Sequence, residues 1–498
     1  MEKIIYSSIL ALSLSIINVH SQIRKGDKLP ESSTLQADYY VRESIPFPKG
    51  EVMEIGSIAL MPDRKVAVAT RRGEIWICTG AYEKDLSKVV WKKVYHAAHE
   101  PLGMYYKDGW LYFTDRGAVG RISDKDANGI YESYELINND WGLTGDYHEY
   151  AFGSTPDKEG NIYTVHCLTG SFHAKAQWRG WCLKITPDGK AIPFSSGIRS
   201  PGGIGYNAAG DVFYTDNQGA WNGTSCIKPL KQGAFTGNPT GNVFYKDAPN
   251  MGKRPLDPIN KSRIVTQAER IPEYMPPAIQ IPHGIVGQSP TALITDTTKG
   301  KFGPFGSQML VGEQTHSQVQ RVYMEKVNDV YQGAVWKMLD GFRCGIVPMR
   351  LSDDGTLFVG GTNRGWASIG GKAFSFERVR WTGKVPFEML EMKALPKGFE
   401  ITFTEPVDEK LALDAANYDC KAWTYVYRAE YGSPEVDKLT PKVTRVEISS
   451  DRKSVKLTLD KMTKGHIHHI NCDKLKSLSG ASLWHSDVYY TLNEIPKE

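Results

Sequence analysis

The chain has 498 residues, 41% of them hydrophobic and 23% charged, and its formal net charge is +4. These proportions are typical of a globular protein with a packed core, and they exclude an intrinsically disordered or membrane-spanning chain. So small a charge, without any run of basic residues, does not favour a nucleic-acid partner. The length allows two or three domains, or one large repeat protein with an appendage.

The first 21 residues have the pattern of a secretory signal peptide. "MEKIIYSSILALSLSIINVHSQ" contains one early lysine, an apolar stretch, and small or polar residues around Ser21. No lipobox cysteine accompanies this segment, and no later segment is long and apolar enough to cross a bilayer. We therefore predict cleavage before Gln22, an N-terminal extension over residues 22–49, and a mature protein that is secreted or periplasmic.

A strand–turn–strand pattern recurs between residues 50 and 383. Each copy opens with a small residue and a short apolar strand, passes through a turn that usually reads D-G, A-G or E-G, and ends in a β-rich strand and a polar loop. The copies begin near residues 56, 102, 151, 203, 284 and 345, at spacings of about 46 to 81 residues. That spacing fits one four-stranded propeller blade per copy, with insertions in the later copies. We predict an all-β fold with a six-bladed β-propeller over residues 50–383; a degenerate seventh blade within residues 235–280 stays open.

From residue 384 onward, alternating strands continue without the blade pattern. These 115 residues of short strands and turn signals fit an immunoglobulin-like β-sandwich, which we predict as an accessory domain over residues 384–498. Within it, "HIHHI" puts His466 and His468 on one face of a strand. Zinc ligation is one interpretation, but no third ligand stands nearby, and an exposed strand face is favoured.

Seven cysteines in a chain of this length make no disulfide framework. Cys167 with Cys182, or Cys420 with Cys472, could form a disulfide within one domain, and buried free thiols are the alternative. No C-x-x-C-H motif occurs, so the chain encodes no covalently bound haem.

Ionisable side chains stand directly before the first strand of every copy. In a propeller that strand lines the central channel, so the preceding residue lies at the channel mouth, and the loop after the second strand returns to the same face. The residues before the first strands are Glu54, His99 with Glu100, His148, Arg199, His283 and Arg343. The loops after the second strands hold Asp115, Arg116, His166, Asp216, Asn217, Gln218, Glu313, Gln314, His316, Asn363 and Arg364. Each residue alone could be a solvated loop residue, but the set predicts a polar binding funnel.

His148 is the best candidate for chemistry in this funnel. It is flanked by Asp146 and Glu149, and a carboxylate partner can hold an imidazole in one tautomer as a general base near neutral pH. An ordinary hydrogen-bonded histidine is the alternative. Arg199 and Arg343 suit carboxylate, phosphate or quinone oxygens, because a guanidinium binds anions as a fork. They could instead pair with Glu54 and Glu100.

The segment "DKDANGIYESYE" matches a twelve-residue calcium loop, with a glycine at the tight turn. An ordinary polar turn is the alternative. Because the segment follows the third strand of the second copy, we expect it on the face opposite the funnel, where calcium would act as a structural clip. The predicted ligands are Asp124, Asp126, Asn128, Ile130 through its carbonyl, Glu132 and Glu135.

Several of these motifs resemble known proteins. "HEYAFGSTPDKEGNIYTV", "GIRSPGGIGYNAAGDVFYTDNQG" and "GFRCGIVPMRLSDDGTLFVG" resemble blades of the soluble quinoprotein glucose/sorbosone dehydrogenases. A closer likeness, covering most of residues 50–498, is to exported bacterial propeller proteins of the "membrane-bound dehydrogenase" type. It is carried by the sequences "PHGI", "GKFGPF", "QTHS", "TNRGW" and "WTGK".

The resemblance implies a sugar-oxidising site. In the quinoprotein dehydrogenases a histidine removes the hydroxyl proton of a sugar, and hydride passes to pyrroloquinoline quinone held by arginines and calcium. Carried over to this sequence, His148 would be the base, and Arg199 and Arg343 would contact the cofactor. Together with the funnel pattern, this predicts His148, Asp146 and Arg199 as catalytic residues. The predicted cofactor-binding residues are Arg199, Arg343, His283, Asp216, Asn217, Gln218 and Arg364. Two departures stand out: His148 is followed by Glu-Tyr rather than by a glycine pair, and the cofactor-contacting lysine has no evident counterpart.

Three functions therefore stay open. The first is an exported sugar dehydrogenase-like enzyme that oxidises a carbohydrate with a quinone-type cofactor. It would need an external electron acceptor, because the chain has no haem domain. The second is a polysaccharide lyase or hydrolase, in which His148 or His283 moves protons and an arginine neutralises a uronate. The third is a non-catalytic glycan-binding propeller. The fold alone cannot choose among them, since propellers host all three.

Overall fold

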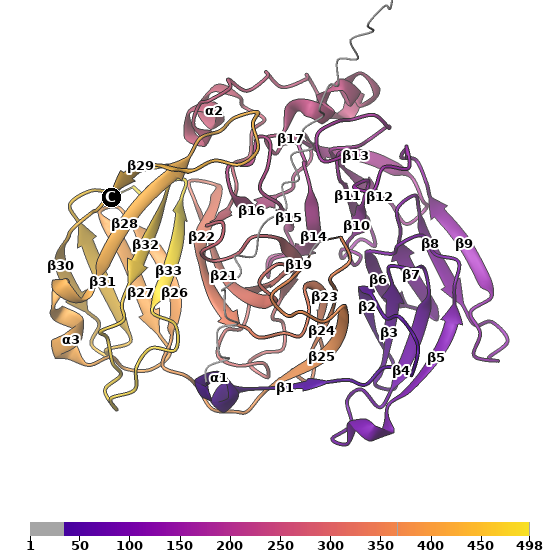
Figure 1. Cartoon of the computed structure of the whole chain (residues 1–498). Helices are drawn as coiled ribbons and strands as arrows, with labels where there is room; N and C mark the ends of the chain where they lie inside the picture. The colour runs from indigo at the N-terminus through magenta and orange to yellow at the C-terminus, as the bar shows by residue number, and fades with distance from the viewer. Residues whose placement is uncertain (1–33, 366, 498) are drawn as a thin grey trace, which may run out of the picture.

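The computed structural model describes residues 34–365 and 367–497, so the predicted signal peptide lies outside the described residues. The all-β class is confirmed: the described residues form 33 strands, β1 to β33, and only three short α-helices. Figure 1 shows the strands gathered into separate twisted sheets. Among the described residues, every helix is too short or too polar to cross a membrane.

The first two sheets are antiparallel, and their strands follow chain order. They contain β2 (Ile55–Met61), β3 (Lys65–Thr70), β4 (Ile75–Thr79) and β5 (Val90–Tyr95), then β6 (Gly103–Lys107), β7 (Trp110–Thr114), β8 (Val119–Ser123) and β9 (Ser133–Asn138). The β6–β7 turn shows how the sequence produces this antiparallel pairing of neighbouring strands. Lys107 pairs with Trp110 across Asp108 and Gly109, whose φ angles are +49° and +84°. An Asp-Gly pair adopts such angles readily and matches the twist of the flanking strands.

The next two sheets are interrupted by an insertion. Their strands are β10 (Ala151–Gly153), β11 (Ile162–His166), β12 (Trp181–Ile185), β13 (Ala191–Ser196) and β17 (Ala234–Phe235), then β14 (Pro201–Tyr206), β15 (Val212–Asp216), β16 (Ser225–Pro229) and β18 (Ile279–Ile281). Between β17 and β18 lie 3-10 turns and α2 (Ile264–Arg270). Residues 235–280 therefore supply no sheet of their own, and the seventh blade is absent from this described segment.

The last two sheets of the ring use both ends of the chain. They contain β19 (Pro290–Thr295), β20 (Met309–Glu313), β21 (Gln318–Val327) and β22 (Val330–Leu339), then β23 (Ile346–Leu351), β24 (Leu357–Thr362) and β25 (Phe374–Trp381). The outer neighbour of β25 is β1 (Tyr40–Ser44), which follows α1 (Thr34–Tyr39), and Tyr40 pairs with Trp381. Residues 40–44, which the sequence placed in an N-terminal extension, thus complete the last sheet.

The first strands of the six sheets contact one another in a closed, propeller-like ring: β2 beside β6, then β10, β14, β19, β23 and β2 again. Glycine permits the closest approaches. A Cβ atom on Gly205 of β14 would lie 2.1 Å from the carbonyl oxygen of Leu293 in β19. Close contact between these strands brings the loops at one end of the ring together.

Two further sheets pack on each other at the C-terminal side of the ring, at the left of Figure 1. One contains β26 (Met389–Leu395), β27 (Gly398–Phe403), β31 (Ser454–Leu459) and β30 (Val443–Ile448). The other contains β33 (Asp487–Leu492), β32 (His466–Asn471), β28 (Asp419–Tyr425) and β29 (Glu435–Leu439); α3 (Glu409–Leu413) precedes β28. Because β33 pairs with β22, the second sheet continues a sheet of the ring.

The burial of His466 and His468 corrects one prediction. Their exposed fractions are 8% and 2%, and burial lowers the pKa of His468 to about 3, so the expected exposed strand face is wrong. The strand lies between β28 and β33, and His468 packs on Phe399 of the opposing sheet. All seven cysteines are buried free thiols, so neither disulfide forms.

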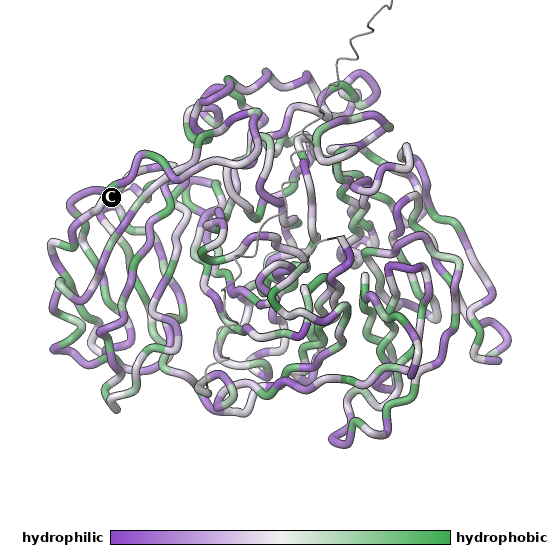
Figure 2. The backbone as a smooth tube through the Cα atoms, in the orientation of Figure 1, coloured by the Kyte–Doolittle hydropathy of each residue, from purple (hydrophilic) through white to green (hydrophobic). Residues whose placement is uncertain are grey.

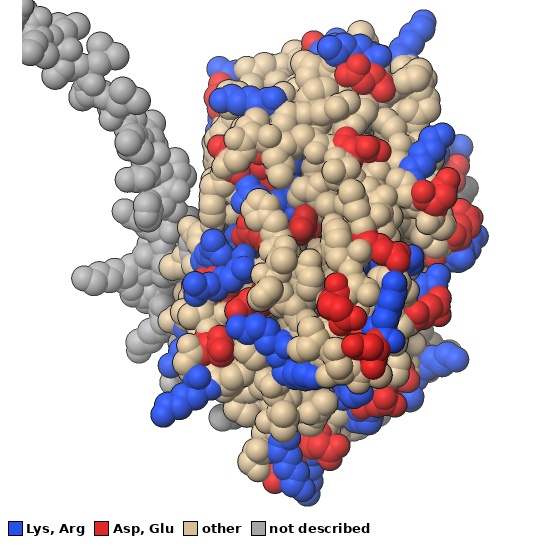
Figure 3. Space-filling model, turned by 90° about the vertical axis from the view of Figure 1, so that its right-hand side faces the viewer, with Lys and Arg blue, Asp and Glu red and all other residues tan. Residues whose placement is uncertain are grey.

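Hydropathy alternates along most strands, as the successive green and purple segments of Figure 2 show. On the face around β5 and β9, side chains of both charge signs are interspersed (Figure 3). Such mixed charge fits outer strands that face solvent rather than a ligand.

The close packing at Gly205 gives a stability test. We expect Gly205→Ala to lower the free energy of unfolding by about 1 to 3 kcal/mol, because the added methyl group meets the β19 backbone. Urea unfolding measures this. Gly306→Ala is the matched control, since a Cβ atom there meets nothing within 4 Å. Equal stability of the two variants would contradict the tight ring.

Candidate functional site

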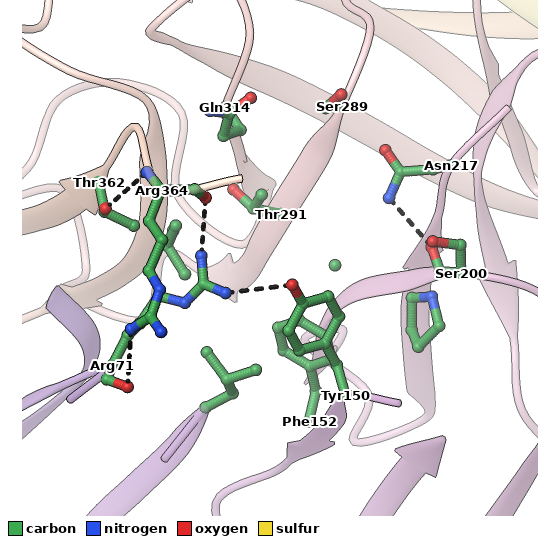
Figure 4. A pocket seen from close by; sticks show the side chains of 14 residues that line it. Arg71, Tyr150, Phe152, Ser200, Asn217, Ser289, Thr291, Gln314, Thr362 and Arg364 are labelled. Carbon is green, nitrogen blue, oxygen red and sulfur yellow. Dashed lines mark hydrogen bonds between the residues drawn. The ribbon is translucent and has the colours of Figure 1, made fainter. Parts of the chain in front are cut away.

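A cavity opens where the loops of the six sheets converge, with about 570 Å³ of empty space that includes its open mouth. Figure 4 shows its polar lining, in which Arg71, Arg364 and Tyr150 point toward one another. Every sheet of the ring contributes to it. One lining residue from each, in chain order, is Arg71, Leu102, Tyr150, Asn217, Thr291 and Val347.

A buried ion cluster lies behind the wall that Arg71 and Tyr150 form. Glu100 accepts hydrogen bonds from Arg71 Nε at 2.6 Å and from Arg116 Nη1 at 3.0 Å. Both guanidinium carbons lie 5.4 Å from the ring centroid of Tyr150, whose hydroxyl accepts from Arg71 Nη2 at 3.1 Å. Burial disfavours the charge on Arg71, but the Glu100 carboxylate outweighs it and raises the pKa of Arg71. Two cations share one carboxylate, so the wall stays positively charged.

Glu100 has a φ of +56°, a conformation that residues other than glycine seldom adopt. Its two arginine partners hold it there. Sequence reasoning placed Glu100 and Arg116 in the funnel but missed Arg71, which follows β3 in "TRRGEIW". The signal was present, because Arg71 comes directly after a second strand, as the other funnel residues do.

His148 lies half-buried in the turn before β10. Its backbone N–H donates to Asp146 Oδ1 at 2.8 Å, and the same oxygen accepts from Gly170 N at 2.9 Å. Asp146 therefore fixes the loop rather than the imidazole. Burial lowers the pKa of His148; the Asp146 charge partly offsets this, and the nearby guanidinium groups of Arg199 and Arg116 lower it further. The imidazole is thus neutral near pH 7, in the state that can accept a proton.

Arg199 is only 4% exposed and lies between two aromatic rings. Its Cζ atom is 5.6 Å from the Phe172 centroid and 5.1 Å from the Tyr431 centroid. Nη1 donates to the carbonyl oxygen of Gln218 at 2.7 Å, while the buried Nε has no hydrogen-bond partner among the described residues. A Cβ atom on Gly219 would lie 2.0 Å from Cζ, so glycine lets the loop cover the guanidinium.

The three predicted cofactor residues at and after the end of β15, Asp216, Asn217 and Gln218, differ in their burial and in their hydrogen-bond partners. Asp216 is fully buried, and its carboxylate binds Lys228 Nζ at 3.1 Å and Ser200 N at 2.8 Å. Burial opposes the charge on Asp216, yet Lys228 keeps its pKa lowered. Asn217 lines the cavity and donates to the Ser200 carbonyl oxygen at 3.0 Å. The Gln218 amide donates to the Gly223 carbonyl oxygen at 3.1 Å. Asp216 thus stabilises the loop residues at the cavity mouth, because β15 directs its side chain into the protein interior.

The remaining predicted cofactor residues are dispersed. Arg364 lines the cavity, with Nη1 3.3 Å from the Arg71 carbonyl oxygen. Arg343 is exposed, donates to Ser44 Oγ at 2.9 Å, and does not line the cavity. His283 does not line it either; its Nδ1 is buried without a partner among the described residues, and burial together with His316 lowers its pKa to about 4.

His166 also departs from the prediction. It is fully buried, its Nδ1 lies 3.3 Å from the Trp178 carbonyl oxygen, and its ring packs 4.7 Å from that of Trp141. Burial first, and then the charge of Arg179, lower its pKa well below the usual range. His166 is a core residue because it is the last residue of β11, beneath the mouth.

The predicted calcium loop joins β8 to β9 at the opposite end of the sheet from the cavity. Carboxylate oxygens of Asp124, Asp126 and Glu132 lie within 4.8 Å of one another, and Asp124 Oδ1 is buried without a partner among the described residues. Asp124 Oδ2 accepts from the backbone N–H of Gly129, whose φ is +82°. Three carboxylates are therefore close enough to share one cation.

The other predicted calcium ligands lie in the same segment. Asn128 Oδ1 accepts from the backbone N–H of Ile130 at 2.7 Å, which closes the turn. Glu135, the expected last ligand, instead binds Arg121 at 2.9 Å, because the two are cross-strand partners on β9 and β8. The strand begins too early for Glu135 to turn back into the loop.

Comparisons with known proteins are limited to structure. No protein-family model matches the chain, and no curated protein matches it. A putative glucose dehydrogenase from Thermus thermophilus aligns over 68% of this chain and 99% of its own, at 15% identity and a TM-score of 0.49. The quinone-bound aldose sugar dehydrogenase from Streptomyces coelicolor covers 69% and 99%, at 11% identity and 0.46. The quinone domain of a Coprinopsis cinerea pyranose dehydrogenase covers 68% and 95%, at 12% and 0.47. Likenesses this distant assign no role to any residue of this chain.

The ion cluster can be tested by removing its charge. We expect Glu100→Gln to lower the free energy of unfolding by about 3 kcal/mol, because two buried guanidinium groups lose their carboxylate. Chemical denaturation measures the change. Glu54→Gln serves as the control, since its 3.5 Å pair with the more exposed Arg364 contributes less than about 1 kcal/mol. A Glu100 variant as stable as the control would show that the cluster does not stabilise the mouth.

Proposed function

We propose that this chain is an exported sugar dehydrogenase-like enzyme, in which a six-bladed propeller over residues 50–383 carries the site and an immunoglobulin-like sandwich over residues 384–498 is an accessory domain. Its substrate is a carbohydrate hydroxyl or hemiacetal, and an external acceptor takes the electrons. The observation that carries the proposal is a neutral, half-buried His148 near a cavity that contains Arg71 and Arg364 and lies beside Arg199.

Each of these residues has a role in the proposed reaction. His148 accepts the hydroxyl proton, and the positive charge of the buried Arg199 nearby favours the negative charge that the oxygen gains. The carbon that carries this oxygen then loses a hydride, and the C–O group becomes a carbonyl. Because cations surround the imidazole, the protonated form is short-lived and passes its proton to water. Asp146 keeps the turn in place through its two backbone contacts.

A quinone-type cofactor fits the lining better than a neutral group would. Pyrroloquinoline quinone is planar and carries carboxylates, and Arg71 and Arg364 present guanidinium groups to the cavity. When bound, the quinone supplies the acceptor for the hydride. The buried Arg199 guanidinium adds positive charge beside this space. Arg343 and Asp216 are not part of the proposed cofactor contact, since one points outward and the other is buried.

A polysaccharide lyase is the second candidate, favoured by the same positive lining. Arg199 has no ion-pair partner among the described residues, so it could neutralise a uronate carboxylate while His148 removes a proton. Incubation with uronate polymers distinguishes the two functions. A lyase releases unsaturated products that absorb in the near ultraviolet, whereas a dehydrogenase reduces an artificial electron acceptor and releases none.

The role of His148 predicts a pH profile. Its pKa is lowered, and the base is neutral above that pKa, so kcat/KM should fall only below about pH 6.5, the ordinary value for histidine. Purified protein loaded with pyrroloquinoline quinone and calcium is assayed with aldoses and an artificial acceptor. Asp146→Asn should move the midpoint to still lower pH, because the charge that raises the pKa is gone.

His148→Gln should lower kcat at least about 100-fold while quinone binding persists. Wild-type protein that binds no quinone and reduces no acceptor would contradict the dehydrogenase proposal. An unchanged rate in the His148 variant would contradict the base assignment alone.

We further propose that the β8–β9 loop holds calcium as a structural clip, through Asp124, Asp126 and Glu132. Calcium in excess should raise the Tm of the protein by about 2 to 4 °C relative to chelator. Asp124→Asn should abolish that shift. Glu135→Gln should preserve it, because Arg121 already occupies that carboxylate. The same Tm with calcium and with chelator would contradict the site.

A further inference from the structure

The wall beside Arg199 is completed by a loop of the C-terminal sheets, between β28 and β29. In Figure 1 this orange hairpin reaches across toward β16 and β17. Tyr431 in the loop forms a β-bridge with Ala220, which belongs to the loop after β15. Three backbone hydrogen bonds of 2.7 to 3.0 Å join the two loops; they run from Trp221 to Arg428, from Gly432 to Gly219 and from Ser433 to Gly223.

Buried aromatic packing holds this loop in place. Tyr427 is fully buried, its ring stacks 5.8 Å from that of Tyr274, and its hydroxyl donates to the Gly237 carbonyl oxygen. On the far side, the backbone N–H of Ala429 donates to Asn260 Oδ1 at 2.8 Å. The loop is therefore a fixed part of the ring mouth, although its sequence belongs to the accessory sheets.

Exposed aromatic rings surround the mouth. Tyr431 is 48% exposed and Phe172 47% exposed, and both lie against the Arg199 guanidinium. A third ring, Tyr147, is 41% exposed and lies 5.1 Å from the His148 ring. Single exposed aromatics are common on proteins, but here two exposed rings flank one guanidinium and a third lies against His148.

We infer that Tyr431 is a sugar-binding residue supplied by the C-terminal sheets, and that the substrate is the end of an oligosaccharide rather than a free monosaccharide. The inference rests on the proposed function. Tyr431 and Phe172 do not line the cavity, so a single sugar unit bound at the cavity beside the quinone leaves both rings uncovered. A second sugar unit attached to the first covers them.

The chemistry of the rim suits that second unit. One face of a pyranose presents C–H groups that stack on an aromatic ring, while its hydroxyls accept hydrogen bonds at the edge. Arg199 stands between the two rings, and its guanidinium holds both of them in place through cation–π contacts. Tyr431 therefore acts as a specificity residue that distinguishes long from short substrates, and His148 acts on the terminal unit beside the cavity.

Equilibrium binding tests the inference without turnover. Calorimetric titrations compare glucose, xylose and galacturonate with cellotetraose, xylotetraose and tetragalacturonate. We expect wild-type protein to bind at least one tetrasaccharide about 10-fold more tightly than its monosaccharide, as one aromatic stacking contact provides. Tyr431→Ala should reduce that preference to below about 3-fold with monosaccharide affinity unchanged, and Tyr431→Phe should keep it.

Controls separate this effect from a general loss of structure. Tyr134→Ala removes a tyrosine of similar exposure, 46%, from β9 on the outer edge of another sheet, and it should keep the preference. If Tyr431→Ala lowers the Tm, Phe172→Ala tests the same rim from the side of the propeller-like ring of sheets. That variant should also weaken the preference for the tetrasaccharide. No preference in wild-type protein, or equal losses for monosaccharide and tetrasaccharide, would overturn the inference. Absence of acceptor reduction would contradict only the proposed reaction.

Discussion

Close contact between the first strands of six sheets is the constraint on which the site depends. Where β14 meets β19, the backbones approach so nearly that Gly205 has no room for a side chain. The ring remains closed because β1, from the beginning of the described chain, pairs with β25 of the last sheet. With the strands fixed in this way, residues that are distant in sequence, such as Arg71 and Arg364, lie within one cavity.

Charge balance then decides the character of that cavity. Glu100 is shared by two guanidinium groups, Asp216 is committed to Lys228, and Asp146 is committed to backbone N–H groups. The acidic groups therefore serve to hold the structure, and the cluster keeps a positive charge because two guanidinium groups share the one Glu100 carboxylate. Burial first, and then the charges of Arg199 and Arg116, lower the pKa of His148. The excess of arginine at the mouth therefore attracts anions and also helps to keep the base neutral.

The sequence predicted those features of the fold that depend on residues close together in the chain. The β-class, the recurring strand pairs and the Asp108-Gly109 turn follow from alternation and turn chemistry. Arg199, which precedes a first strand, lies beside the cavity, and its role there stays a prediction. The sequence could not tell which way a side chain points. Arg343 turns outward to Ser44, and Glu135 is captured by Arg121 through strand register. Tyr431 was missed because it reaches Arg199 only through contacts between two distant parts of the chain.

The pairing of β33 with β22 has a consequence for synthesis. β22 is ten residues long, and its outer edge finds its partner only when residues 487–492 have left the ribosome. Until then the backbone groups of Gly333, Ala334 and Val335 on that edge lack their partner strand, and an unpaired edge can associate with other chains. Truncation before β33 would therefore do more than remove a C-terminal strand. It would leave the outer edge of β22, which belongs to the ring, unpaired and able to associate with other chains.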